Sequence, residues 1–191
     1  DGFVSRGLGD VYKRQVNWIG LWTLYKKEVL RFLIVWIQTL LSPIISSLLF
    51  LLVLALAIGN ERADVLGYPF ITFLAPGLIA MQVIQQAFSH SSSSFMIGKI
   101  QGNIVDILYA PLSPGEVTTA VVLASATRSF MIAFISIIIF YFLVDIEIRN
   151  IYAVIFFTLI SSIILGCIGV IAGLWAEKFD HMATVTSFII I

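Results

Sequence analysis

The chain has 191 residues, of which 60% are hydrophobic and only 12% are charged, and its formal net charge is +0 at pH 7. A mean hydropathy of +1.04 lies far above that of soluble domains, and the apolar residues come in blocks without the alternation of a membrane β-barrel. The basic residues form no stripe that would bind a nucleic acid. The composition therefore predicts an all-α, polytopic membrane protein.

The first 31 residues divide into two segments. Residues 1–15 are interpreted as a non-native leader, because most of this stretch resembles translated sequencing-adapter sequence. Residues 16–31 predict an amphipathic helix in the membrane interface, with a cytoplasmic extension of the first span as the alternative. Its apolar side carries Trp18, Trp22, Tyr25 and Val29 at helical spacing. Either way, we expect four charged residues at the cytoplasmic surface: Lys26, Lys27, Glu28 and Arg31.

Apolar runs long enough to cross a bilayer follow this segment, since about 20 helical residues cover the hydrocarbon core. Four complete spans are predicted, at residues 32–58, 68–88, 117–143 and 151–176. Residues 182–191 are apolar but too short to cross, and they predict part of a fifth span. We therefore interpret the chain as a fragment of a longer permease-like protein, with residues 32–191 in its membrane domain.

The basic residues of the short loops predict the orientation. The segment before the first span, the loop after the second and the loop after the fourth hold more lysine and arginine than the alternate loops. The N-terminus is therefore predicted to be cytoplasmic.

The loop at residues 97–116 is the most distinctive polar part of the chain. Apolar residues recur at helical spacing within it, at Ile100, Ile104, Ile107 and Leu108. Pro111 and Pro114 then end the pattern before the third span. The spacing predicts a short amphipathic helix on the cytoplasmic side, and it leaves open whether the apolar face meets the membrane surface or a soluble protein.

Polar side chains occur inside the predicted spans. Four are glutamines: Gln38, Gln82, Gln85 and Gln86. They either face a path for a hydrophilic substrate between two permeases or bond neighbouring helices. Arg128 is the one basic residue within an apolar run; it either lines a pore or snorkels to the inner headgroups, and the density of apolar residues after it favours snorkelling.

Small residues recur along one side of the fourth span and predict a packing seam within the subunit. They are Ser162, Gly166, Gly169 and Gly173. His90 lies among five serines, which could suggest a nucleophile and its base, but such a run is more typical of a solvated helix end. A phosphate-binding loop is absent, because the one Gly-Lys pair, Gly98-Lys99, is followed by Ile100.

Several motifs resemble, in order, those of type-2 ATP-binding-cassette (ABC) transporter permeases. The loop carries Lys99-x-x-Gly102, Asp106-x-Leu108 and Ala110-Pro111-Leu112-Ser113-Pro114-x-Glu116. Other matching stretches are residues 25–32, Ser42-Pro43, residues 74–78 and residues 176–180. The likeness covers residues 18–191.

The resemblance implies a six-span permease in a bacterial or archaeal plasma membrane, exporting substrate by alternating access. Its expected partners are a second permease copy, membrane lipid and a separate ATPase subunit, which would bind the ATP and magnesium; this chain would bind no cofactor or metal. The loop would hold a coupling helix at residues 98–110. The implied coupling residues are Lys99, Gly102, Asp106, Leu108, Pro111, Pro114 and Glu116.

Two other functions fit the sequence less well. An ion-coupled carrier or channel would show carboxylates inside its spans, and the four apolar runs hold no Asp or Glu. An intramembrane enzyme would need convergent catalytic groups or metal ligands within the spans. The expected role is therefore that of a transport subunit without enzymatic activity of its own.

Overall fold

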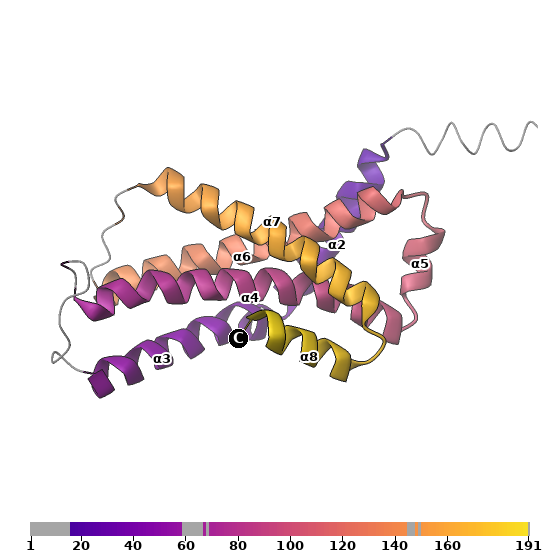
Figure 1. Cartoon of the computed structure of the whole chain (residues 1–191). Coiled ribbons are helices and arrows are strands. Elements are labelled where there is room, and N and C mark those ends of the chain that lie inside the picture. Colours follow the sequence, from indigo (N-terminus) through magenta and orange to yellow (C-terminus); the bar gives the residue numbers. More distant parts are fainter. Residues whose placement is uncertain (1–15, 59–66, 68, 145–147, 149, 191) are drawn as a thin grey trace, which may run out of the picture.

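The computed structural model describes residues 16–58, 67, 69–144, 148 and 150–190, and all the secondary structure in these ranges is helical (Figure 1). Four helical segments are long and apolar enough to cross a membrane: Ile37–Ala57, Phe70–Ile100, Pro114–Val144 and Ile151–Trp175. The prediction of an all-α, polytopic membrane protein with four spans is confirmed. The leader at residues 1–15 lies outside the described residues.

The first predicted span, residues 32–58, is not one continuous α-helix: it holds the end of one α-helix, a π-helical segment and a second α-helix, and most of the first helix covers the amphipathic helix predicted at residues 16–31. Helix α2, Trp18–Ile34, starts at Asn17, whose side-chain oxygen caps it by accepting a hydrogen bond from the Gly20 N–H at 2.9 Å. A π-helical segment, η1, Ile37–Leu41, then leads into α3, Ser42–Ile58. Pro43 supplies the physical reason for the irregularity, because it has no N–H to continue the α-helical hydrogen bonds.

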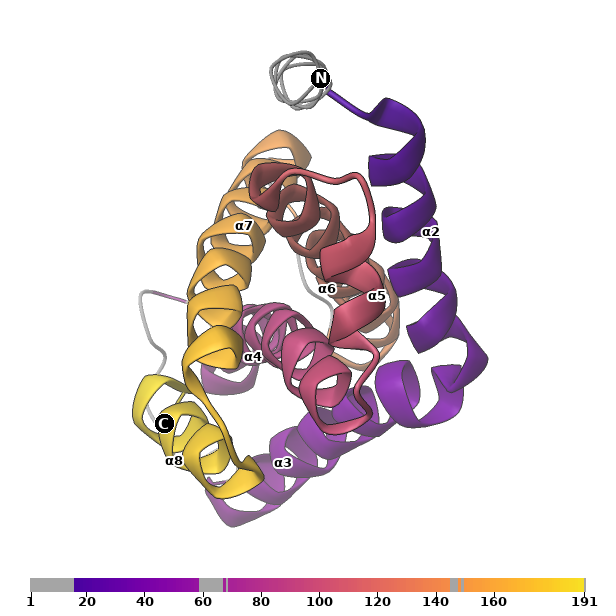
Figure 2. The same cartoon turned by 90° about the vertical axis from the view of Figure 1, so that its right-hand side faces the viewer.

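Two long helices form the centre of the molecule. Helix α4, Phe70–Ile100, and helix α6, Pro114–Val144, each have 31 residues. Each is therefore about 46 Å long, well beyond the hydrocarbon core of a bilayer. They lie side by side, with α3 along one flank and α7, Ile151–Trp175, across another (Figures 1 and 2). The predicted second span was thus too short by twelve residues at its C-terminal end.

The last described helix, α8, Phe179–Ile190, has 12 residues, which corresponds to about 18 Å. It folds back beside α4 and α7 (Figure 2). Its position agrees with the partial fifth span predicted at residues 182–191, although the helix begins three residues earlier.

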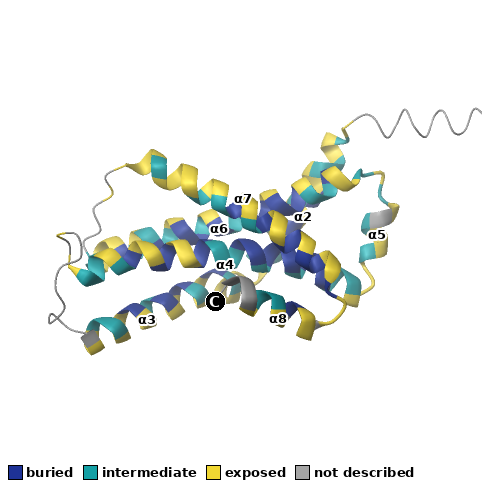
Figure 3. Cartoon of the chain, viewed as in Figure 1, coloured by how far each residue is buried: buried dark blue, intermediate teal, exposed yellow. Residues whose placement is uncertain are grey.

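Burial is concentrated where α4, α6 and α7 meet, and the outward faces of α3 and α7 are exposed and apolar (Figure 3). Phe156, Phe157 and Ile171 on α7, for example, are each more than half exposed. Side chains of this kind are expected where lipid is the solvent.

The predicted small-residue seam on α7 is confirmed as a contact within the subunit. A Cβ atom at Gly169 would lie 2.7 Å from the Phe88 carbonyl oxygen of α4, and one at Gly173 would lie 2.7 Å from that of Ser92. Gly166 faces Ser125 of α6 in the same way, and Ser162 is fully buried. The helices approach so closely because these positions have almost no side chain.

Candidate functional site

The glutamines and the arginine predicted inside the spans meet in one pocket of about 400 Å³. It opens between η1 and α3 on one side and α4 on the other, with α6 behind. The described residues that line it are Gln38, Ser42, Pro43, Ser46, Ser47, Phe50, Leu78, Met81, Gln82, Gln85, Gln86 and Arg128. The sequence identified these four glutamines and the arginine as candidates for a substrate path, but it did not show that they line the same pocket.

Arg128 is directed into this helix bundle. Its Nη2 donates hydrogen bonds to Gln86 Oε1 at 2.6 Å and to the Thr39 carbonyl at 3.3 Å. The Thr39 carbonyl is available because the residue four positions later is Pro43, which has no N–H. A local irregularity in the first span thus provides an acceptor that directs the guanidinium into the helix bundle. The preference for snorkelling over a pore-lining role stays a prediction.

The pocket lies deep within the long helices. Arg128 is 14 residues from the start of α6, and Gln86 is 14 residues from the end of α4. Both are therefore about 21 Å along the helix axis from the end of the bundle that carries the 97–116 loop. Arg128 is therefore well inside the bundle.

Gln82 and Gln86 bond neighbouring helices and line the pocket at the same time. The Gln82 amide donates to the Pro43 carbonyl at 2.7 Å and accepts from the Ser136 hydroxyl at 3.0 Å. For these two glutamines the bonding of neighbouring helices is confirmed, and a substrate path along them stays a prediction. Gln38 and Gln85 lie on the same wall.

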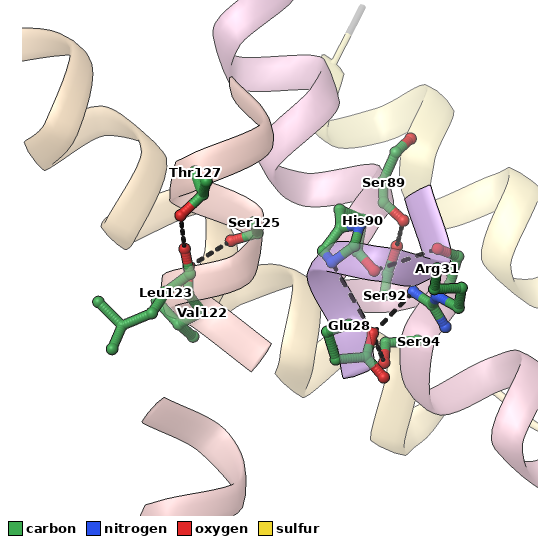
Figure 4. A network of polar contacts seen from close by, with 11 residues as sticks. Glu28, Arg31, Ser89, His90, Ser92, Ser94, Val122, Leu123, Ser125 and Thr127 are labelled. Carbon is green, nitrogen blue, oxygen red and sulfur yellow. Dashed lines mark hydrogen bonds and ion pairs between the residues drawn. The ribbon is translucent and has the colours of Figure 1, made fainter. Parts of the chain in front are cut away.

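A second polar cluster, buried between α2 and α4, centres on Glu28 (Figure 4). Glu28 Oε2 accepts a hydrogen bond from Ser94 Oγ at 2.8 Å, lies 3.0 Å from Arg31 Nη2 and lies 3.8 Å from His90 Nε2. Only 2% of Glu28 is exposed. The expectation that Glu28 lies at the cytoplasmic surface was wrong, because α2 turns this side chain toward α4.

The interpretation of His90 and the serines as a solvated helix end was also wrong. His90 is 1% exposed, and Ser91, Ser92 and Ser94 are buried too. The reason is that α4 continues to Ile100 and receives the glycine side of α7 along this stretch. Within the described residues, no three His, Cys, Asp or Glu side chains gather closely enough to hold a metal ion.

The rest of α2 packs along α6. Tyr25 shares a hydrogen bond with Thr127 across 2.9 Å, and the buried side of the helix includes Leu24 and Phe32. Lys26 and Lys27 are exposed, as predicted. Trp18 and Trp22 are exposed as well, so the interfacial placement of this helix stays a prediction.

The coupling helix predicted at residues 98–110 is shorter in the structure. Helix α5 spans Ile104–Tyr109, while Gly98 to Ile100 belong to α4. Gly102 separates the two helices with a φ of 75°, a left-handed conformation that favours glycine. The end of α5 follows from Pro111, since Ala110 before it is extended, and Pro114 begins α6.

Two of the predicted coupling residues fasten the loop to the bundle. The Lys99 ammonium group donates to the Leu174 carbonyl and, at 3.0 Å, to the Ala176 carbonyl, both at the C-terminal end of α7. Glu116 accepts the backbone N–H of Ser113 at 2.7 Å, and its other oxygen accepts that of Asn17 at 2.6 Å. These two side chains therefore form hydrogen bonds to other segments of the same chain.

The capping arrangement at Glu116 was missed, although the sequence holds its signal. Ser113-x-x-Glu116 with proline at the first helical position is the pattern of a capping box, and the Glu116 N–H does donate to Ser113 Oγ at 3.3 Å. The extra bond from Asn17, 99 positions away, ties the start of α2 to the start of α6.

The exposed part of the loop is a small surface on α5. Asp106 is exposed, Val105 is 46% exposed and Tyr109 is 86% exposed. Of these, only Asp106 was predicted as a site residue. The Leu108 side chain lies outside the described residues. An exposed aromatic ring is typical of a surface that binds another protein, since tyrosine is enriched at such interfaces.

A sequence profile of the family described as ABC-2 type transporter matches residues 20–191. Curated relatives named inner membrane transport permease YadH, from Escherichia coli K12, Escherichia coli O157:H7 and Shigella flexneri, are each 28% identical over 173 residues. The alignments cover 91% of this chain and 68% of each relative. No solved structure was found to match. Because the family profile extends over most of the chain and the fold is a polytopic helical bundle, the protein belongs to the ABC-2 type transporter family.

Proposed function

We propose that this chain is the permease subunit of an ABC exporter in a bacterial or archaeal inner membrane. A separate ATPase subunit supplies the energy, and a second permease copy completes the path. Family membership supports the permease role, and the relatives are named as inner membrane transport permeases. Coupling to an ATPase is supported by the hydrogen bonds of Lys99 and Glu116, which tie the loop around α5 to neighbouring helices.

Movement of this loop would act on several helices at once. The loop continues directly from α4 and into α6. Lys99 attaches it to the end of α7, and Glu116 attaches it to the start of α2. A protein that pushes on α5 would therefore displace the ends of four helices together. Such a connection suits rigid-body rocking between inward-open and outward-open states.

The ATP chemistry is assigned to the partner. The Gly98-Lys99 pair lies in the last turn of α4. Its helical backbone N–H groups are already bonded within the helix, unlike those of a phosphate-binding loop. ATP and magnesium would bind to the ATPase subunit.

The pocket around Arg128 is assigned to the substrate path. It lies deep in the helices and is lined by amide and hydroxyl groups, which lipid tails would not solvate. Another pocket, of about 390 Å³ between α4, α6 and α7, has a mostly apolar lining that suits acyl chains better.

The test is co-purification of the full-length permease with the proposed ATPase subunit after the two are expressed together. We expect Tyr109→Ala and Asp106→Asn each to reduce the ATPase recovered, roughly tenfold for the tyrosine, because exposed aromatic anchors dominate protein interfaces. Gly102→Val should act similarly by straining the turn before α5. Membrane insertion should be intact in all three.

Tyr152→Ala is the matched control, since Tyr152 is 81% exposed at the opposite end of the bundle. It should leave ATPase recovery unchanged. Full recovery with all three loop variants would count against α5 as the docking site. Transport that continues in cells lacking the ATPase would instead favour an ion-coupled carrier.

A further inference from the structure

The wall of the Arg128 pocket has a definite chemical character. Its described polar residues are three serines, four glutamines and one arginine, with no carboxylate among them. A guanidinium group is charged at every physiological pH. The pocket therefore presents a single fixed positive charge among neutral hydrogen-bonding groups.

Among the described residues, no carboxylate pairs with this positive charge. The Arg31 guanidinium pairs with Glu28, and His90 Nε2 lies 3.8 Å from the same carboxylate, so neither of these contacts reaches Arg128. The acceptors for Arg128 are a carboxamide and a backbone carbonyl, both neutral, and its Nε atom has no hydrogen-bond partner. A guanidinium held at this depth is costly unless an anion joins it.

We propose that the pocket binds a ligand with a phosphate-type anionic group, and that Arg128 selects for that group. This inference rests on the proposed function of the pocket as the substrate path. The two bonds to Gln86 and Thr39 hold the guanidinium in place before the ligand arrives. Arginine is well suited to this task because its planar donors match the oxygen atoms of a phosphate.

The remaining wall fits hydroxyl groups beside the phosphate. Gln38, Ser42 and Ser46 are exposed on the α3 side, and Gln85 faces them from α4. The Ser46 and Ser47 hydroxyls donate to carbonyls of their own helix at 3.0 and 2.9 Å, so their oxygen atoms remain acceptors for ligand hydroxyls. Glycerol phosphate headgroups and sugar phosphates share this combination of groups.

The ligand phosphate has two possible sources, a phospholipid headgroup or a soluble sugar phosphate. To separate them, the purified full-length permease is placed in nanodiscs of phosphatidylcholine alone or of phosphatidylcholine with phosphatidylglycerol. Glucose 1-phosphate or neutral glucose is then added to the phosphatidylcholine discs. Binding is measured from the rise in melting temperature and, for lipid, from phosphatidylglycerol retained in native mass spectra.

We expect one of the two phosphate compounds to bind and neutral glucose to bind much more weakly. Arg128→Gln should weaken phosphate binding roughly tenfold or more, because a charge-assisted hydrogen bond is lost, and Arg128→Lys should keep part of it. Ser46→Asp changes neither hydrogen-bond partner of Arg128 but adds a negative charge to the wall, which repels a phosphate and competes for the guanidinium, so it should weaken phosphate binding as well.

Lys27→Gln is the matched control, because it removes an exposed positive charge that does not line the pocket. It should leave binding unchanged. Phosphate binding that survives both Arg128→Gln and Ser46→Asp would overturn the proposal, and so would equal binding of glucose and glucose 1-phosphate. In either case, continued co-purification with the ATPase would show that the proposed permease function stands while the substrate class fails.

Discussion

At the residue scale, Glu28 shows how a charged side chain can be structural. It is buried, with partners on two helices: Arg31 on its own helix and Ser94 on α4, while His90 Nε2 of α4 lies 3.8 Å away (Figure 4). The cluster joins the N-terminal amphipathic helix to the centre of the bundle. A buried acceptor of this kind stabilises chiefly because its removal leaves the partners unsatisfied.

Glu28→Ala is expected to destabilise the folded protein by about 1–3 kcal/mol, since Ser94 and Arg31 each lose an acceptor. The measurement is the thermal unfolding midpoint of the detergent-solubilised permease. Lys27→Ala, on the exposed side of the same helix, should change stability by less than about 0.5 kcal/mol. Equal midpoints for the two variants would mean that the Glu28 cluster contributes nothing to stability.

Residue type alone identified the polar positions in the spans, because a glutamine or arginine in an apolar run is conspicuous. It could not identify their partners. The acceptors for Arg128 are the Gln86 side chain on α4 and the Thr39 carbonyl on η1, and both lie far from Arg128 along the chain. Such pairing depends on how the helices are packed, which local sequence does not encode.

At the element scale, the close contact of α4 with α7 depends on glycine. Phe88 and Ser92 present backbone carbonyls directly to Gly169 and Gly173. The small-residue spacing on α7 was readable from the sequence. The extension of α4 to Ile100 was not, because its last part is rich in serine and looks polar until α7 covers it.

Gly169→Ala is expected to destabilise the protein by about 1–3 kcal/mol, because its Cβ would lie 2.7 Å from a backbone oxygen that cannot move aside. Gly77→Ala is the control: nothing lies within 4 Å of a Cβ there, and alanine favours a helix. Thermal unfolding should show a lower midpoint for the first variant and an unchanged or higher one for the second. An unchanged midpoint for Gly169→Ala would show that the two helices can separate freely.

The loop elements were partly predictable. The prolines correctly marked the end of α5 and the start of α6, because proline excludes helix before it and suits a first helical turn. The apolar spacing from Ile100 to Leu108 suggested one continuous helix, which was wrong. Gly102 interrupts it, so Ile100 ends α4 and Ile104 begins α5.

At the scale of the whole molecule, the ends of the bundle carry different chemistry. The end with α5 holds the anchored loop and the exposed surface of Asp106 and Tyr109. The opposite end carries the starts of α4 and α7 (Figure 1). The distribution of lysine and arginine predicts that the α5 end faces the cytoplasm, where an ATPase could reach it.

Cysteine labelling tests this orientation. In a Cys167→Ser background, which removes the single native cysteine, Tyr109→Cys and Tyr152→Cys place a thiol at each end of the bundle. A membrane-impermeant maleimide should label position 152 in intact cells and position 109 only in inverted vesicles. Labelling of position 109 in intact cells would reverse the predicted topology and remove the docking surface from the ATPase.

The sequence by itself determined the class of fold, the four spans and the residues that do not suit lipid, because bilayer thickness and the cost of burying polar groups act on local composition. It also carried the family motifs. The tertiary structure alone decided that Arg128 and the glutamines share a pocket, that Glu28 is buried against α4, and that Lys99 and Glu116 fasten the α5 loop. Each of these joins residues on different helices, and only the packing of those helices brings them within hydrogen-bond distance.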